Sequence, residues 1–254
     1  MIKSIHRDAA IALYDSGRGV ESVLRACQQL LPQEKWLIMQ DAQHQSYGNK
    51  TDEEIIRAGD DCFQNIIQKR VKAIVVACHT SSAIALPTLS QRYAYPMLGM
   101  QRPTARLLAE AYTHDHIIWL ATPASVVADR LFPQARQLGF KGCVHPVACH
   151  QWVDCIEQNR VAEIHVMLED FVARHHDLFS RPNMKILYGC THYPLLDRLL
   201  VKYLKTPCER IDPAITTAEA LKLLLAQHDI LRSGAKPSVR LLNGVAFQPS
   251  AVFA

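Results

Sequence analysis

The sequence predicts an α/β fold in which mainly parallel sheets are flanked by helices. Short runs of apolar, often β-branched residues alternate along the chain with longer segments whose apolar residues recur at helical spacing. Strands that alternate with helices favour parallel sheets with crossover helices. The 254 residues are enough for one large domain or two small ones of this class. The composition, 49% hydrophobic and 20% charged, excludes disordered and fibrous classes.

Near the N-terminus, the order of strand, turn and helix predicts a corner that can hold an anion. Residues 11–14 form an apolar run, the turn 15–19 carries two glycines, and apolar residues at helical spacing follow from 20 to 31. The first amides of a helix have no partner within it, so such a corner can bind an anion. Asp15 would repel an anion, and it is therefore either a helix cap, which this turn taken alone favours, or a base that handles protons or an ammonium group.

The next unit places a polar loop after a strand. The apolar residues 36–39 lead to a loop over 42–51, and a helix with apolar residues on one face begins at Asp52. Loops at the C-terminal ends of strands hold substrate contacts in many α/β proteins. The loop is therefore a candidate part of a substrate site, whereas the apolar helix face belongs to the core.

Two cysteines occupy matching positions at the ends of predicted strands. The apolar run 73–77 ends at Cys78, which precedes three hydroxyl residues at a helix start, and the run 184–189 ends at Cys190, ahead of a helix opened by Pro194. The positive end of a helix favours a thiolate. One such cysteine is usually a small buried hydrophobe. Two with matching surroundings predict two half-sites that face each other.

The remaining segments complete two predicted domains. The chain is expected to cross between them at Leu98–Gly99, and the strand 117–121 and the helix 162–178 follow in the second domain. Residues 208–213 are expected to form a strand that returns to the first domain, and residues 238–243 a last strand. The predicted first domain comprises residues 1–98 and 209–254, and the second comprises residues 99–208.

Composition also excludes several kinds of partner. The net charge of +4 comes from 28 basic and 24 acidic residues spread along the chain, without the basic patches of nucleic-acid binders. No apolar run reaches the roughly 18 residues of a membrane span, so a cytoplasmic protein without a membrane partner is expected. No two of the eight cysteines have the spacing of a structural zinc site, which favours reduced thiols.

Two opposed thiols suit one kind of chemistry better than others. A nucleophilic cysteine needs one thiolate, one histidine and an orienting group, and a cysteine hydrolase would leave the second thiol without a role. Stereoinversion by proton transfer needs a base on one face of a carbon and an acid on the other, each with a proton affinity near the working pH. Cys78 and Cys190 meet that requirement if helix ends or neighbours lower their pKa modestly.

Four segments resemble, in order and spacing, the motifs of cofactor-independent glutamate racemases: Leu13–Gly17, Asp41–Gly48, Val75–Thr80 and Gly189–Leu196. The resemblance spans residues 11 to 214, and the last of these segments is the most specific. It implies an α/β fold of two pseudo-symmetric domains, each a mainly parallel sheet flanked by helices, with the active site in the interdomain cleft.

The resemblance also implies the roles of individual residues. Cys78 and Cys190 would be the acid and base, Asp15 would assist the first thiol, and His192 and Glu157 would assist the second. Glu157 is assigned from the spacing of the segment Cys149–Glu157. Neither pyridoxal phosphate nor a metal is implied as a cofactor. Residues that would contact the amino-acid substrate are Ser16, Tyr47, Gly48, His79, Thr80, Ser125 and Thr191. A homodimer and a supply of D-glutamate for peptidoglycan are further implications.

The chain departs from the family pattern at three places. His79 follows the first cysteine where asparagine is usual, the turn reads Gly17-Arg18-Gly19-Val20 where a further glycine is usual, and Ser125 stands in place of a threonine. Because residue 79 normally helps to hold the amino acid near its α-carbon, these departures leave substrate identity open. The alternatives are an aspartate racemase, a related enzyme acting on another activated acid, or a racemase-like binding protein without turnover.

Overall fold

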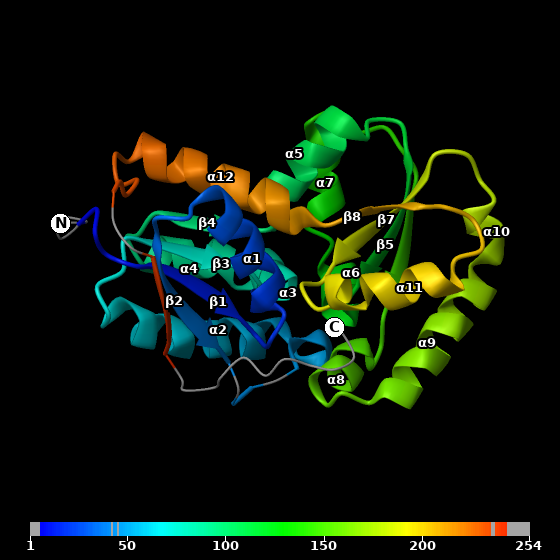
Figure 1. Cartoon of the computed structure of the whole chain (residues 1–254), viewed down its shortest axis with the longest axis horizontal. Coiled ribbons are helices and arrows are strands. Elements are labelled where there is room, and N and C mark those ends of the chain that lie inside the picture. The colour runs from blue at the N-terminus through cyan, green and yellow to red at the C-terminus, as the bar shows by residue number, and fades with distance from the viewer. Residues whose placement is uncertain (1–5, 42, 45, 235–236, 243–254) are drawn as a thin grey trace.

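The computed structural model of the chain describes residues 6–41, 43–44, 46–234 and 237–242. It contains two separate sheets, each flanked by helices, which lie side by side along the long axis of the molecule (Figure 1). Every pair of neighbouring strands in both sheets is parallel. The predicted α/β class with two parallel sheets is therefore confirmed. Within the described ranges, no helix is long and apolar enough to cross a membrane.

The first sheet has five strands in the order β4-β3-β1-β2-β9. Its central strand, β1, is buried along its whole length, and its alternate residues face opposite layers of helices. Ile11 and Leu13 pack with α1 and α12, whereas Ala12 and Tyr14 pack with α2, α3 and α4. The strands are β1 (Ile11–Asp15), β2 (Lys35–Gln40), β3 (Ala73–Val76), β4 (Met97–Gly99) and β9 (Ser238–Leu241).

The second sheet has four strands in the order β6-β5-β7-β8. Helices again cover both faces, which is why its central strands are almost continuously apolar. Ile118 and Ile186 pack toward α8, α9 and α11, whereas Trp119 and Leu187 pack toward α5 and α7. The strands are β5 (His116–Ala121), β6 (Val144–Ala148), β7 (Met184–Gly189) and β8 (Glu209–Ile211).

The helices follow the strands in the order expected for crossover connections. In the first part of the chain they are α1 (Val20–Leu30), η1 (Tyr47–Asn49), α2 (Asp52–Ile67), α3 (His79–Ile84), α4 (Leu86–Arg92) and α5 (Gln101–Ala111). The others are α6 (Pro123–Ala128), α7 (Leu131–Gln137), α8 (Trp152–Glu157), α9 (Val161–Arg174), α10 (His176–Phe179), η2 (Tyr193–Leu196), α11 (Asp197–Tyr203) and α12 (Pro213–Gln227).

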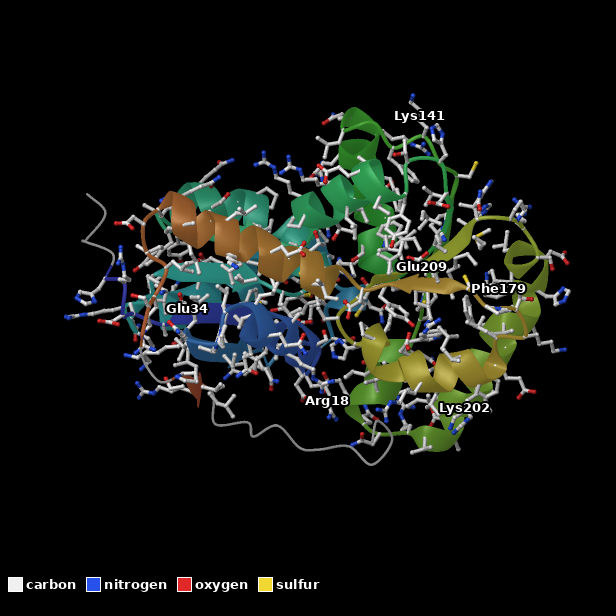
Figure 2. All side chains as sticks on the ribbon, turned by 45° about the horizontal axis from the view of Figure 1, so that its top comes forward. Arg18, Glu34, Lys141, Phe179, Lys202 and Glu209 are labelled. Carbon is white, nitrogen blue, oxygen red and sulfur yellow. The ribbon has the colours of Figure 1, made fainter. Side chains whose placement is uncertain are left out.

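The strand predicted over 208–213 lies in a different sheet from the expected one. Glu209–Ile211 form β8, which pairs with β7 in the second sheet and does not return to the first. Figure 2 shows Glu209 on the side of the molecule that holds the second sheet. The chain returns through α12, whose buried residues pack against β1 and α1, and then through β9. The predicted sheet of this strand was wrong, because the sequence of a three-residue strand does not indicate which strand it pairs with.

Other boundaries differ by smaller amounts. The predicted crossing at Leu98–Gly99 falls inside strand β4, which pairs with β3 in the first sheet. The helix predicted over 162–178 is two helices, α9 and α10, separated at His175. The last predicted strand is shorter, and residue 243 lies outside the described residues. The predicted limits of the two domains stay a prediction.

Candidate active site

Both predicted thiols lie just beyond the C-terminal ends of strands near the middle of each sheet. Cys78 follows β3 and caps helix α3, where the backbone amide of Ser81 donates to its Sγ at 3.5 Å. Cys190 directly follows β7 and precedes the helical turn η2. Side chains at the C-terminal ends of parallel strands face the crevice in which open α/β sheets bind ligands. Each sheet therefore delivers one sulfur to this crevice.

The two thiols line one small cavity with a volume of about 10 Å³, which is room for about one water molecule. Both cysteines are almost fully buried, at 5% and 7% exposure. Most of the residues predicted to contact substrate line the same cavity. Its walls consist of Ser16, Tyr47, Gly48, Cys78, His79, Thr80, Thr122, Val153, Cys190, Thr191 and His192.

The surroundings of Cys78 are polar, and they carry a buried carboxylate. Ser16 Oγ lies 3.4 Å from Cys78 Sγ and also 3.4 Å from Asp15 Oδ1. The expected lowering of the Cys78 pKa was wrong, because burial, followed by the negative charge of Asp15, raises the pKa of this thiol. Burial also raises the pKa of Asp15 to about 6, against the opposing effects of His192 and Thr191. The first half-site therefore holds protons more tightly than free side chains would.

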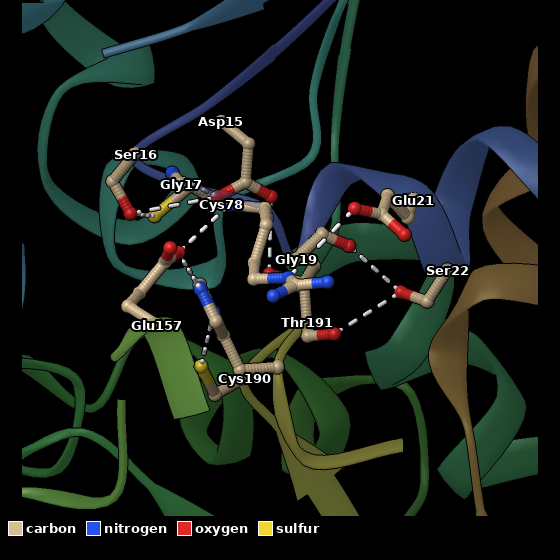
Figure 3. Close-up of polar contacts among 12 residues, drawn as sticks. Asp15, Ser16, Gly17, Gly19, Glu21, Ser22, Cys78, Glu157, Cys190 and Thr191 are labelled. Atoms are coloured by element: carbon tan, nitrogen blue, oxygen red, sulfur yellow. Dashed lines mark hydrogen bonds and ion pairs between the residues drawn. The ribbon is translucent and has the colours of Figure 1, made fainter. Parts of the chain in front are cut away.

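The surroundings of Cys190 are different, because an imidazole and a second carboxylate lie beside the sulfur (Figure 3). His192 Nδ1 is 3.6 Å from Cys190 Sγ, and His192 Nε2 is 2.6 Å from Glu157 Oε1. Burial disfavours the charged ring, yet the hydrogen bonds to Cys190 and Glu157 raise the pKa of His192 well above its ordinary value. Burial likewise opposes ionisation of Glu157, but its bond to His192 keeps its pKa low. His192 is therefore an imidazolium whose two N–H groups donate to Glu157 and Cys190.

The two halves of the site are tied together through the turn that follows β1. Thr191 Oγ1 donates to Asp15 Oδ2 at 3.0 Å, and the Arg18 amide donates to Glu157 Oε1 at 2.8 Å. Figure 2 shows Arg18 where this turn meets the second-sheet side of the molecule. A Cβ atom at Gly17 would collide with the Glu157 carboxylate, and one at Gly19 would collide with Thr191. Glycine is required at both places because backbone meets side chain directly.

Three hydroxyls form a cluster on another wall. Thr80 Oγ1 lies 2.9 Å from Thr122 Oγ1 and 3.1 Å from Ser125 Oγ, and Thr122 Oγ1 donates to Ser125 Oγ at 2.9 Å. Thr122 also caps helix α6 through the amide of Ser125. Because Thr80 belongs to the first sheet's helices and the other two to the second's, the cluster joins the two parts beside the cavity.

His79 lines the cavity as a neutral ring. Its side chain is buried, and burial lowers the pKa of the imidazole to about 3. Gln101 Nε2 donates to its backbone carbonyl at 3.0 Å and so anchors the start of α3. A neutral imidazole has one donor and one acceptor nitrogen, so His79 can offer a substrate a hydrogen bond of either kind but no charge.

The structure thus brings together most of the predicted site and adds two lining residues. Asp15, Ser125 and Glu157 do not line the cavity but contact residues that do. Thr122 and Val153 line it although they were not assigned. The sequence did carry a signal for Thr122 as a site residue, because it is a hydroxyl residue at a helix start after a strand. It carried none for Val153, because an apolar residue in a helix predicts a core position. Over the described part of the chain, no group of three or more potential metal ligands gathers.

Comparisons with known proteins find that the chain is similar in sequence and in fold to glutamate racemases. No family model matches the chain. The chain is 30% identical over 229 residues to the glutamate racemase of Trichodesmium erythraeum, an alignment that covers 88% of this chain and 83% of that protein. Its fold is similar to the glutamate racemase isoform RacE1 of Bacillus anthracis, with a TM-score of 0.83, 25% identity and coverage of 93% and 88%. A second similar fold is the Francisella tularensis glutamate racemase solved with D-glutamate, with a TM-score of 0.79, 23% identity and coverage of 92% and 88%.

Proposed function

Because the chain belongs to the glutamate racemase family, an isomerase family, we propose that it interconverts L- and D-glutamate by proton transfer between two cysteines. The observation that carries this proposal is that Cys78 and Cys190, one from each sheet, line a single small cavity. A carbon bound between them would face one sulfur on each side. That is the arrangement in which one group removes the α-proton while the other supplies a new one from the opposite face.

The proton balance of the proposed reaction is simple. In one direction the Cys190 thiolate takes the α-proton, the electron pair of the C–H bond remains on the α-carbon, and the Cys78 thiol gives its proton to the opposite face. In the other direction the roles of the two sulfurs exchange. His192 and Glu157 would stabilise the anion on Cys190, because the imidazolium donates directly to that sulfur. Asp15 and Ser16 would keep the proton on Cys78 between these steps.

The cavity wall suits a small amino acid with two carboxylates. The cavity is lined by five hydroxyl residues: Ser16, Tyr47, Thr80, Thr122 and Thr191. In the structure Ser16 and Thr191 donate to Asp15, Tyr47 donates to Asp41 and Thr122 donates to Ser125. Each hydroxyl has one hydrogen, so these four must turn it toward a substrate carboxylate when one binds. The amides at the start of α3 have no partner within that helix and add further donors. We propose that these groups hold the substrate carboxylates, and that His79 contacts the substrate near its α-carbon.

No cofactor enters this proposal, since both proton-transfer groups belong to the protein. D-glutamate made in this way would serve peptidoglycan synthesis, and a cytoplasmic location and a homodimeric assembly complete the prediction. The peptidoglycan role and the homodimer come from the resemblance to the family, and the location comes from the hydropathy pattern of the sequence. They stay predictions.

The proposal is tested by incubating the purified protein with L-glutamate in heavy water, without added cofactor. We expect the optical rotation to fall to zero and deuterium to appear at the α-carbon at the same rate. Rotation that is unchanged over hours for both glutamate and aspartate contradicts the proposal. A racemase-like binding protein would then remain, and calorimetric binding of glutamate without inversion would identify it.

Aspartate is a second candidate substrate, and one observation favours it. The His79 ring occupies part of a cavity that is already small, and asparagine, usual in the family at this position, would leave more room. A shorter dicarboxylate requires less widening of this space than glutamate does. If kcat/KM for aspartate exceeds that for glutamate in the heavy-water assay, the substrate assignment changes while the proton-transfer roles of the two cysteines do not.

A further inference from the structure

The turn that carries the second thiol contains a backbone carbonyl that its own turn does not satisfy. Thr191 directly follows Cys190 and is 4% exposed. A carbonyl in a turn usually accepts from the amide three or four residues further along the chain. Here the residue three further on is Pro194, which has no N–H, and the amide of Leu195 donates to the carbonyl of His192 at 3.1 Å. The carbonyl of Thr191 therefore needs a donor from another part of the molecule.

The donor is Ser22, which lies on helix α1 in the half of the molecule that holds the first sheet. Its hydroxyl donates to the carbonyl of Thr191 at 3.2 Å and to the carbonyl of Gly19, three residues before it, at 3.0 Å. Figure 3 shows both contacts as dashed lines that meet at Ser22. A hydroxyl has one hydrogen, so the two carbonyls share it. The contact with Gly19 is local, whereas the contact with Thr191 joins the two halves.

Thr191 is thus held by the first half of the molecule at three points. Its hydroxyl donates to Asp15 Oδ2 at 3.0 Å, and its carbonyl accepts from Ser22. Its side chain packs directly on the turn after β1, where a Cβ atom at Gly19 would collide with Thr191 Oγ1. The residues on either side of Thr191 are the second thiol and the imidazole beside it. Contacts that fix Thr191 therefore also fix the backbone that carries both of these groups.

The size of the cavity shows that the two halves must also separate. Its volume of about 10 Å³ is room for about one water molecule, so an amino acid does not fit unless the walls move apart. Each half supplies one wall, because Cys78 follows a strand of the first sheet and Cys190 follows a strand of the second. The bond from Ser22 to Thr191 crosses between these halves, and it must break when they separate.

We propose that Ser22 is a positioning residue that holds the turn carrying Cys190 and His192 against the first half of the molecule while the cavity is closed. Its importance for turnover rests on the proposed racemase function. Ser22 is not one of the residues that line the cavity, and it acts through the carbonyl of Thr191. Without the hydroxyl, that carbonyl is unpaired in the closed form, whereas water satisfies it in the open form. Loss of the hydroxyl therefore shifts the protein toward the open form.

The test measures how readily the cavity opens, through the rate at which iodoacetamide alkylates each cysteine in the absence of substrate. Mass spectrometry of the digested protein follows Cys78 and Cys190 separately. Both are almost fully buried, so the reagent reaches them when the two halves separate. In Ser22→Ala we expect both to react about fivefold faster or more than in the unaltered protein, which is the effect of one net hydrogen bond on the opening equilibrium.

Two other cysteines of the same protein distinguish opening of the cavity from damage to the fold. Cys27 lies on helix α1, as Ser22 does, and is buried in the core of the first sheet. If the substitution loosens α1 itself, alkylation of Cys27 accelerates too. Cys143 is exposed and reports the intrinsic reactivity of the reagent. We expect the rates at Cys27 and Cys143 to be the same in Ser22→Ala and in the unaltered protein.

Matched variants test the hydroxyl itself. Ser22→Thr keeps a hydroxyl, and Ser22→Val has nearly the same shape without one. We expect Ser22→Val to accelerate alkylation of the two cavity thiols as Ser22→Ala does, and Ser22→Thr to restore the rates of the unaltered protein. Ser90→Ala is the control for the local bond, because Ser90 also donates to the carbonyl three residues before it, that of Pro87, at 3.2 Å. We expect all rates in Ser90→Ala to be unchanged.

An unchanged alkylation rate of Cys190 in both Ser22→Ala and Ser22→Val overturns the inference, and so does an equal acceleration at Cys27. An unaltered protein that does not invert glutamate or aspartate instead overturns the proposed function. Because alkylation is measured without substrate and without turnover, the two failures are distinguishable.

Discussion

The two thiols occupy equivalent positions in the two sheets, but a carboxylate lies near one of them and an imidazole contacts the other. Cys78 follows a strand of the first sheet and has a hydroxyl and a buried carboxylate as neighbours. Cys190 follows a strand of the second sheet and accepts from an imidazolium held by Glu157. The two sheets place a cysteine at the same kind of position, after a strand, but the side chains around each sulfur differ. These side chains determine how strongly each thiol holds its proton.

This difference is compatible with a reaction between mirror-image molecules. The equilibrium constant between two enantiomers is one, so kcat/KM must be equal in the two directions whatever the proton affinities of the two groups are. An unsymmetrical pair therefore carries no thermodynamic penalty for the overall reaction. What it sets is how firmly a proton is held: burial and the charge of Asp15 favour the thiol at Cys78, whereas the proposed role of His192 is to stabilise an anion on Cys190 when one forms.

The largest expected effect tests whether both sulfurs are needed. We expect Cys78→Ser and Cys190→Ser each to lower kcat/KM for glutamate by about 10²–10⁴-fold or more, since a serine hydroxyl is a far weaker acid than a thiol. Polarimetry with both enantiomers measures the effect. Cys27→Ser alters a buried cysteine in the core of the first sheet and is the control. An unchanged kcat/KM after either substitution would contradict the proposal that proton transfer uses both cysteines.

The next effect concerns the carboxylate of the first half-site. Burial raises the pKa of Asp15 from 3.8 to about 6, so the folded protein binds this proton more tightly than the unfolded chain does. Between about pH 4 and pH 6 folding therefore takes up a proton, and the contribution of Asp15 to stability falls as the pH rises through that window. For Asp15→Asn we expect this loss, on the order of 2–3 kcal/mol, to disappear.

Urea unfolding of both proteins at pH 4 and pH 7 measures that difference, because any effect of the substitution that is independent of pH cancels. An identical pH dependence of the unfolding free energy in the two proteins would show that folding does not raise the pKa of Asp15. The same substitution removes a negative charge beside Cys78, and we expect alkylation of that thiol to begin at lower pH.

A smaller effect is expected from the second half-site. Glu157→Gln replaces a charge-assisted hydrogen bond to His192 by a neutral one, and we expect kcat/KM to fall about 10–100-fold, equivalent to the 1.5–3 kcal/mol of such a bond. The fall must be equal for both enantiomers. The primary deuterium isotope effect on kcat/KM should rise only for the enantiomer from which Cys190 removes the proton. Equal changes for both enantiomers would contradict the assignment of Glu157 to one sulfur alone.

The smallest effect is expected at His79, which distinguishes this chain from the usual family pattern. The pKa of about 3 means that the ring is neutral above pH 5. His79→Asn therefore exchanges one neutral hydrogen-bonding group for another, and we expect KM for glutamate to change by less than about tenfold. The shape of the pH profile between pH 5 and 8 should not change. A titration near pH 6 that vanishes in the variant would show that the ring carries charge in the folded protein.

The sequence predicted the thiol positions well because their signal is local. A buried strand, a cysteine and a helix start lie within about ten residues, and parallel sheets bring such strand ends together. Glu157 was assigned from the resemblance of the segment Cys149–Glu157 to the family in spacing, and its carboxylate lies 2.6 Å from the His192 ring. The pairing of β8 and the contact of Val153 with the cavity depend on tertiary packing that the residues themselves do not encode locally. Tyr14 resembled any core residue of a strand, and only the structure reveals its hydroxyl partners.

The glycine turn after β1 has a consequence for the timing of the chemistry. Through it, Asp15 accepts from a threonine of the opposite lobe, and Glu157 accepts from an amide of the opposite lobe. A separation of the lobes wide enough to release a product would break both bonds. Each carboxylate would lose one hydrogen bond in the same movement, while Asp15 keeps those from Ser16 and Gly17 and Glu157 keeps the one with His192. The proposed site is therefore completely assembled only while the two halves of the molecule are in contact.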